Sequence, residues 1–360
     1  MPELPTGPGG GVREVLSTLA ASGTLRELYG KEPTGRLDPL LLRRLLADAD
    51  ASGPQGTVLA LLVQLATAIP LLADAAATPV TREVLRAALE GETLLALAAT
   101  DAAAAGSDLA ALGTTVDLSD QDGDLVVSGV KRWVTSALSA DHALVLARHR
   151  PGRHFTSFTW VLVPLDAPGV TVRPADTDLF QGSGVGDVHL SSVTLPRTHL
   201  LGRPGRGLAL FARHLAVERL ASAAWAIELC RRVVGDTGHH LAGRLLDGVP
   251  LRNSPSVRQR LAACAVQVSA LHALWMQSHE RIATDRDATA AAVLKALSGT
   301  TVERVLNECG QLQGADGFGR GGIQQLRAEA AVFGIGGGAT EVVLDTTAER
   351  LDQVLAGLTP

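Results

Sequence analysis

The sequence predicts an α+β fold with an N-terminal helical domain, a middle antiparallel β domain and a C-terminal four-helix bundle. Two changes of hydrophobic period support this prediction. Apolar residues recur every three or four positions up to about residue 99, strand-like runs follow, and helical spacing returns after Pro204 and Gly205. Abundant Ala and Leu, with aromatics at only 3%, also suit helices. We expect domains over residues 1–99, 100–203 and 204–360.

The N-terminal domain has four helical stretches, at residues 12–28, 38–50, 58–73 and 81–90. The third is the most apolar segment of the chain. Gln64 and Pro70 interrupt it, and it is shorter than the ~20 residues that a membrane span needs. We therefore expect a buried core helix and no membrane partner.

The middle domain changes to runs rich in Val, Thr and aromatic residues, which are typical of strands. These runs are residues 125–128, 143–147, 158–163, 170–172 and 188–193. Asp122 and Gly123, between 116–118 and 125–127, indicate a hairpin. The last domain has long helical stretches at 208–234, 257–284, 288–309 and 340–355, joined by short Gly- or Pro-containing segments, which predicts a bundle.

Composition excludes several classes of protein. The formal net charge of −5 and the lack of a long basic run argue against a nucleic-acid partner. Three widely separated cysteines, with no CxxC pair, indicate neither a disulfide framework nor a metal site. The N-terminus lacks the pattern of a signal peptide, so we expect a cytoplasmic protein.

Short motifs lie at the junctions between these blocks. They are Thr100-Asp101, Gly106-Ser107-Asp108, Trp133-Val134-Thr135, Glu218-Arg219, the Gln311-x-x-Gly314-x-x-Gly317 turn and the glycine-rich turn 336–341. In this order and spacing the set resembles the acyl-CoA dehydrogenase flavoprotein family, over about residues 79–351. The resemblance implies FAD as cofactor and an acyl thioester, on coenzyme A or an acyl carrier protein, as substrate.

The flavin contacts follow from the resemblance. Trp133 would flank the ring, Thr135 would hydrogen-bond it and Thr100 would meet its pyrimidine edge, which suits a cofactor that needs a flat wall and donors. Asp101 replaces the family's usual Glu. The alternative for Trp133 is an ordinary buried strand residue.

Ser107 and Asp108 would lie near the thioester and pantetheine, or would simply form a capped turn. Arg244, Gln311, Gly314 and Gly317 match the family's site for the pyrophosphate and adenine, which is completed by a neighbouring subunit. The resemblance therefore implies a homodimer or homotetramer. The alternative for Arg244 is a solvated bundle charge.

The position of the catalytic base is the main departure from the family pattern. In most members a Glu in the turn before the last helix removes the α-proton, and here Gly337 stands there. A minority of the family places its base on the first bundle helix immediately before an Arg. Glu218 fits that pattern, with Arg219 expected to bind substrate, although this Glu-Arg pair also occurs as a structural feature. Glu341 is a poorer candidate.

The flavin-contacting Thr of the last turn is Ala339 here, and Thr340 could take its place. The leading function is thus FAD-dependent dehydrogenation of an acyl thioester, with an unidentified electron acceptor. The alternatives are a flavin oxidase or monooxygenase of the same fold, and a degenerate partner subunit that lacks the usual base. No glycine-rich segment lies in a βαβ unit, which argues against a nicotinamide cofactor.

Overall fold

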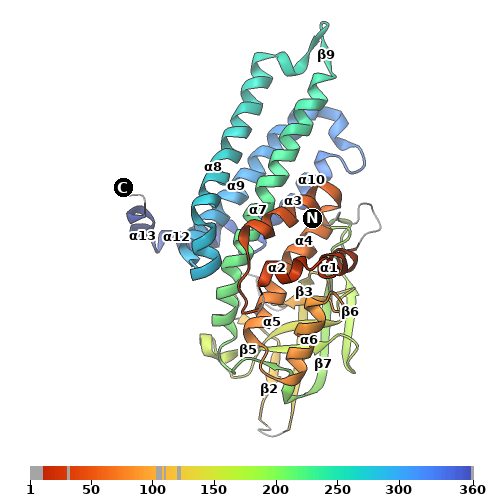
Figure 1. Ribbon diagram of the computed structural model, residues 1–360, viewed down its shortest axis with the longest axis vertical. Coiled ribbons are helices and arrows are strands. Elements are labelled where there is room, and N and C mark those ends of the chain that lie inside the picture. The colour runs from red at the N-terminus through yellow and green to blue at the C-terminus, as the bar shows by residue number, and fades with distance from the viewer. Residues whose placement is uncertain (1–10, 31–32, 103–107, 109–110, 120–122, 358–360) are drawn as a thin grey trace. The chain divides into compact units, whose positions relative to one another are not determined.

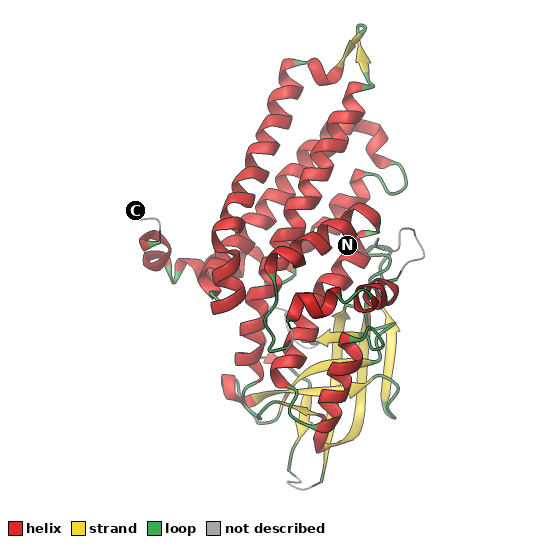
Figure 2. Ribbon diagram, in the orientation of Figure 1, coloured by secondary structure: helices red, strands yellow, loops and turns green. Residues whose placement is uncertain are grey.

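The computed structural model describes residues 11–30, 33–102, 108, 111–119 and 123–357. They fall into two compact units. Unit 1 contains residues 1–42 and 52–218, and unit 2 contains residues 43–51 and 219–360. Helices, then a sheet, then a helical bundle follow one another along the chain, which confirms the predicted fold class (Figures 1 and 2). The three domain boundaries stay a prediction.

The helices of unit 1 precede its sheet. They are α1 (Val12–Ala21), α2 (Thr24–Tyr29), the start of α3 (Pro39–Ser52), α4 (Gln55–Val63), α5 (Ile69–Ala75) and α6 (Pro79–Leu89). A π-helical turn, Gln64–Ala68, joins α4 to α5. The stretch Gln55–Ala75 is long and apolar enough to cross a membrane, but 89% of its most apolar window is buried inside the protein. The predicted core helix is therefore confirmed.

Eight described strands form the sheet of unit 1, in the order β6-β7-β3-β2-β4-β5-β8 with β1 also beside β4. Their bounds are β1 (Leu95–Ala98), β2 (Thr115–Asp117), β3 (Asp124–Val134), β4 (His142–Arg148), β5 (Phe158–Pro164), β6 (Val170–Pro174), β7 (Gly186–Pro196) and β8 (Leu200–Leu201). The pairing of β2 with β3 confirms the predicted hairpin, whose Asp122 lies outside the described residues.

Two features of the sheet differ from the sequence prediction. Residues 95–98, which lie in the expected N-terminal helical domain but in none of its predicted helices, form β1, because a short apolar run suits a buried strand as well as a helix. The sheet is also not purely antiparallel, since β4 pairs in parallel with both β1 and β2. Valine, leucine and alanine side chains of these strands form the core cluster of the sheet.

A buried ion pair lies within this apolar sheet. Lys131 on β3 is fully buried, and its Nζ lies 3.4 Å from Oδ2 of Asp101 and 3.2 Å from the carbonyl oxygen of Ala99. The same Asp101 oxygen accepts hydrogen bonds from the backbone and hydroxyl of Thr114, at 2.8 and 2.6 Å. Burial lowers the pKa of Lys131 to about 8, and the nearby Asp101 carboxylate opposes this effect.

Unit 2 is helical apart from one small hairpin (Figure 2). Its described elements are most of α7 (Gly207–Ala242), β9 (Leu245–Leu246), β10 (Val249–Pro250), α8 (Pro255–Asp285), α9 (Ala288–Gln313), α10 (Ile323–Ala330), α11 (Val332–Ile335), α12 (Thr340–Ala348) and α13 (Leu351–Ala356). Helix α7 begins in unit 1 and continues into unit 2. The sequence did not predict α10 and α11.

Asp50 connects α3 to α7 inside unit 2. Its side chain is almost fully buried and accepts hydrogen bonds from Trp225 Nε1 at 3.2 Å and from Arg232 Nε at 2.8 Å. A buried carboxylate with such partners is satisfied, whereas Arg232 without Asp50 would be a partly buried charge that keeps only the more distant, exposed Asp236.

The Lys131 pair predicts a pH-dependent stability. The pKa of Lys131 is about 8 in the folded protein and 10.5 in an unperturbed lysine, so the unfolded chain binds more protons between these values. The free energy of unfolding of the wild type minus that of Lys131→Met should therefore rise by about 2–3 kcal/mol from pH 8 to pH 10.5. Urea unfolding across this range measures it. Arg132→Met, at an exposed position, is the control, and the same difference taken with this variant should not change with pH. A difference between wild type and Lys131→Met that stays constant from pH 8 to pH 10.5 would contradict the prediction.

The Asp50 cluster gives a second prediction. Asp50→Asn should lower the free energy of unfolding by about 3 kcal/mol, because it removes the buried carboxylate that accepts two bonds from Arg232. Asp236→Asn is a matched control, since Asp236 lies 3.9 Å from the same guanidinium but its side chain is 66% exposed. It should cost less than about 1 kcal/mol. Equal losses in the two variants, measured by chemical denaturation, would show that burial does not set the strength of this pair.

Candidate active site

Trp133 leaves strand β3 at a bulge. The register of β3 with β7 shifts by one residue between Lys131 and Val134, and Trp133 has a φ of +54°. A positive φ is strained for a bulky residue, and bulges commonly redirect a side chain next to a functional site. The indole is 50% exposed, so the alternative of a buried strand tryptophan is wrong.

The turn after this bulge carries Thr135 and Ser136. Thr135 is half-buried, and Ser136 also has a positive φ, of +66°. The Ser136 hydroxyl is buried and has no hydrogen-bond partner among the described residues. A buried hydroxyl without a partner costs free energy unless a water molecule or a ligand bonds it.

The Thr100 segment lies against the Trp133 strand. The carbonyl oxygen of Thr100 accepts a hydrogen bond from the backbone of Arg132 at 3.2 Å, and Ala102 donates to Val130 at 3.0 Å. The structure therefore brings Thr100 next to the strand that carries Trp133, as the family pattern requires. Asp101, the unusual residue of this motif, forms the buried pair with Lys131 that joins the segment to β3.

These residues fit a flavin. An exposed indole on a strained bulge offers a flat wall, and the half-buried Thr135 two residues later carries a hydroxyl that can hydrogen-bond a heteroaromatic ring. Ser107 lies outside the described residues. Asp108 forms a two-oxygen ion pair with Arg153, at 2.7 and 2.8 Å, so its contact with a thioester stays a prediction.

Glu218, the predicted base, lies on α7 and is half-buried. Its Oε2 accepts a hydrogen bond from the Thr67 hydroxyl at 3.0 Å. Thr67 belongs to the π-helical turn and is fully buried. The base candidate is thus held by a partner that the sequence analysis did not identify, although a lone threonine in an apolar helical stretch is a usable signal.

Arg219, the next residue of α7, contacts the glycine-rich turn of unit 2. Its Nε donates to the Gly337 carbonyl oxygen at 2.9 Å. Gly337 and Gly338 have φ values of +69° and +107°, which favour glycine over any residue with a side chain. The backbone of this turn therefore differs from one that carries a Glu side chain at position 337, because both glycines have a positive φ. A substrate contact of Arg219 stays a prediction.

Thr340 begins α12 after Ala339. Its hydroxyl donates to the Gly334 carbonyl oxygen at 3.2 Å, which fixes the turn locally. Its predicted flavin contact is not tested by this bond. Glu341 is exposed on the same first turn of α12.

The predicted adenine and pyrophosphate residues are brought together in unit 2. Arg244 forms an ion pair with Asp316, which lies inside the Gln311 turn, and His240 Nε2 lies 3.3 Å from the same carboxylate. Gly314 has a φ of +60°, Gly317 is buried and the Gln311 side chain is exposed. Asp316 would compete with a phosphate for the Arg244 guanidinium. The ion pair between Arg244 and Asp316 must therefore break if a phosphate binds to Arg244.

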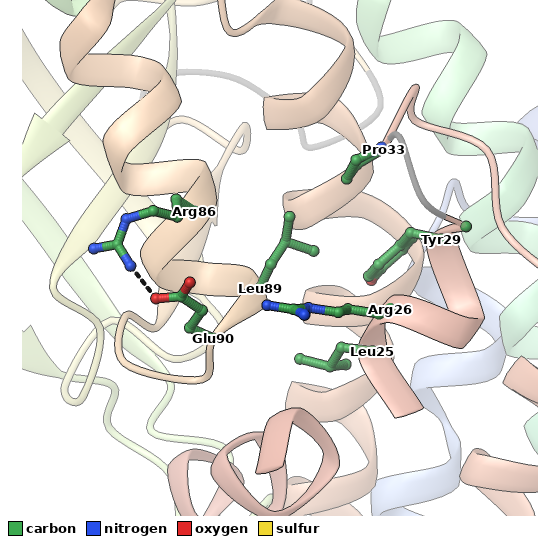
Figure 3. A pocket seen from close by; sticks show the side chains of 8 residues that line it. Leu25, Arg26, Tyr29, Pro33, Arg86, Leu89 and Glu90 are labelled. Carbon is green, nitrogen blue, oxygen red and sulfur yellow. Dashed lines mark hydrogen bonds and ion pairs between the residues drawn. The ribbon is translucent and has the colours of Figure 1, made fainter. Parts of the chain in front are cut away.

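A surface pocket between α2 and α6 is lined by residues other than the predicted site residues (Figure 3). It is lined by Leu25, Arg26, Tyr29, Gly30, Pro33, Arg86, Leu89 and Glu90. Arg86 points toward Glu90 across one side of it, as an ion pair. The pocket contains none of the predicted site residues. The described residues contain no cluster of His, Cys, Asp or Glu that could hold a metal ion.

Comparison with known proteins agrees with this geometry. Residues 96–193 match the family model for the acyl-CoA dehydrogenase middle domain, and residues 205–352 match that for its C-terminal domain. The chain is 26% identical to acyl-CoA dehydrogenase AFT10-1 of Alternaria alternata, over 81% of this chain and 69% of that protein.

It is also 29% identical to the acyl-[acyl-carrier-protein] dehydrogenase MbtN of a Mycobacterium species, over 79% of this chain and 73% of the relative. Among solved structures, the FAD complex of PigA has the same fold, with a TM-score of 0.85 and 19% identity, over 94% of this chain and 89% of PigA. The two family models together span more than half of the chain. The protein therefore belongs to the acyl-CoA dehydrogenase family.

Proposed function

We propose that this protein catalyses FAD-dependent α,β-dehydrogenation of an acyl thioester, with Glu218 as the base. One observation carries the assignment of the base: the Glu218 carboxylate is half-buried and oriented by a buried hydroxyl, at 3.0 Å. The turn that supplies the base in most of the family has glycine at 337 and 338, both in left-handed conformations. A carboxylate must therefore come from elsewhere, and α7 supplies one.

Each site residue has a distinct task in this proposal. FAD, when bound, supplies the two-electron acceptor for the hydride that leaves the β-carbon. Glu218 takes the α-proton, so that the two C–H bonds break and a carbon–carbon double bond forms. Trp133, Thr135 and Thr100 would hold the flavin ring, and Arg219 holds the turn around Gly337 in place.

The substrate is a thioester on coenzyme A or on an acyl carrier protein. Both kinds of carrier occur in the names of relatives, one an acyl-CoA dehydrogenase and one an acyl-[acyl-carrier-protein] dehydrogenase. The altered base turn favours the carrier-protein form, as an analogy with dehydrogenase-like proteins of specialised metabolism. The electron acceptor is a separate redox partner of unidentified kind.

The proposal includes a homodimer or homotetramer in the cytoplasm. Arg244 adjoins the hairpin of β9 and β10, whose Leu245, Leu246 and Val249 side chains are all more than half exposed. Such an apolar tip suits contact with a second copy, which would place Arg244 near that copy's cofactor. The three cysteines are free and buried, which suits a reducing compartment.

A degenerate partner subunit is the second candidate, and one contact favours it. Arg244 is paired with Asp316, which would oppose the binding of a pyrophosphate. Purified protein that stays colourless after incubation with FAD would support this candidate. Fast reoxidation of reduced flavin in air, with peroxide release, would instead support the oxidase.

The base assignment predicts that Glu218→Gln lowers the rate of anaerobic flavin reduction by about a hundredfold to ten-thousandfold. The amide keeps the shape of the side chain but cannot accept the α-proton at neutral pH. Butyryl, octanoyl and palmitoyl thioesters, each on coenzyme A and on an acyl carrier protein, serve as substrates in stopped-flow absorbance. The flavin content of the variant should equal that of the wild type.

Glu341→Gln is the matched control, because Glu341 is the other carboxylate considered for this role and is exposed. It should reduce the flavin at the wild-type rate. A wild-type rate in Glu218→Gln, or a loss confined to Glu341→Gln, would remove Glu218 from the mechanism. If no thioester reduces the flavin of the wild type, the dehydrogenase proposal itself fails.

A further inference from the structure

The partner of Glu218 lies on an unusual helical segment. Residues Gln64–Ala68 form a π-helical turn, and the backbone of Ile69 donates to the Gln64 carbonyl oxygen five residues earlier. Pro70 explains the turn, since it has no N–H to donate to Ala66 and its ring displaces that carbonyl group. Short π-helical turns inside α-helices occur often at functional sites.

The π-helical turn directs two polar side chains to different neighbours. Gln64 pairs with both backbone groups of Leu95 on β1: its amide donates to the carbonyl, and its carbonyl accepts from the Leu95 N–H at 3.2 Å. Thr67 donates to Glu218 on α7. The Gln64 and Thr67 side chains are both fully buried, and the Glu218 acceptor is half-buried.

A second contact fixes the same two helices in register. Asp74 on α5 lies 3.2 Å from Nε2 of His214 and 3.1 Å from Arg213, both on α7. Thr67 and Asp74 are seven residues apart on one helical rod, whereas Glu218 and His214 are four apart on α7. Each pair therefore lies on one face of its helix.

Gly35 packs against the His214–Asp74 contact at a position that has no room for a side chain. Gly35 has a φ of +75°, and a Cβ there would lie 2.9 Å from the Pro70 carbonyl oxygen and 3.1 Å from Cε1 of His214. The glycine backbone thus packs directly onto the His214–Asp74 pair. With α7 held in this way, the distance from Thr67 to Glu218 is set by the fold.

We infer that Thr67 is a positioning residue for the catalytic base. Its hydroxyl holds Oε2 of Glu218, which selects one rotamer of the carboxylate before substrate binds. The inference rests on the proposed role of Glu218. Fixing a reacting group in its productive orientation removes an entropic cost from the chemical step, and a misplaced group loses rate without losing affinity.

A hydroxyl suits this task better than other small side chains. It donates to the carboxylate before proton transfer, and it can accept from a carboxylic acid afterwards. The contact can therefore persist while the charge of Glu218 changes. Valine has nearly the same shape as threonine and can do neither, whereas serine keeps both abilities.

Thr67→Val tests the inference. It should lower the limiting rate constant of anaerobic flavin reduction by about tenfold to a hundredfold, as expected for the loss of a hydrogen bond to a charged group. The apparent dissociation constant of the substrate and the flavin content should not change. The substrate is the butyryl, octanoyl or palmitoyl thioester that reduces the wild-type flavin fastest. Thr67→Ser should restore most of the rate.

Thr57→Val is the matched control. Thr57 is a buried threonine of α4 on the same helical rod, and its hydroxyl has no partner among the described residues. Thr57→Val should therefore keep the wild-type rate. Equal rates for Thr67→Val and Thr57→Val would overturn the inference, as would a failure of Thr67→Ser to restore the rate.

The design separates this inference from the proposed function. If Glu218→Gln abolishes reduction while Thr67→Val does not slow it, only the role of Thr67 fails. If Glu218→Gln reduces the flavin normally, the base assignment fails first. Should Thr67→Val not fold, Thr67→Cys replaces it, because a thiol is a weak donor. Equal rates for Thr67→Cys and Thr67→Ser would then contradict the inference.

Discussion

The hydrogen bond between Thr67 and Glu218 is the contact on which the rest of the site depends. It fixes a carboxylate on α7, a helix of 36 residues that begins in one compact unit and continues into the other. The next residue of that helix, Arg219, holds the Gly337 turn through its carbonyl oxygen. The proposed base and the residue that holds the Gly337 turn are thus adjacent on α7.

In the β domain, a buried polar pair also fixes one segment against another. Lys131 and Asp101 join the Thr100 segment to β3, and the bulge that follows turns Trp133 outward. Lys131 and Asp101 are both buried, where an unsatisfied polar group costs about 1–3 kcal/mol and a typical hydrogen bond contributes about 1 kcal/mol. Asp101 thus bonds Lys131 of β3 and Thr114, the residue immediately before β2.

Most of the helices and strands could be predicted from the sequence, because the spacing of apolar residues distinguishes long helices from strands. The order and spacing of the six motifs, among them those of Thr100, Trp133 and Glu218, were enough to identify the family. The prediction missed β1 and the parallel pairings of β4 in the sheet, since a four-residue apolar run carries no period that separates strand from helix. Thr67, Ser136 and the Arg244–Asp316 pair could not be found, because side-chain partners distant in sequence depend on the packing of several elements.

The most direct test of the account is a crystal structure of the FAD-loaded protein with an acyl thioester in which sulfur replaces the β-carbon. Such an analogue cannot be dehydrogenated, so it reports the geometry before the reaction. The account predicts a Glu218 carboxylate oxygen about 3–3.5 Å from the α-carbon, with the other oxygen still bonded to Thr67. A Glu218 side chain turned away from the thioester, with another carboxylate in its place, would contradict it.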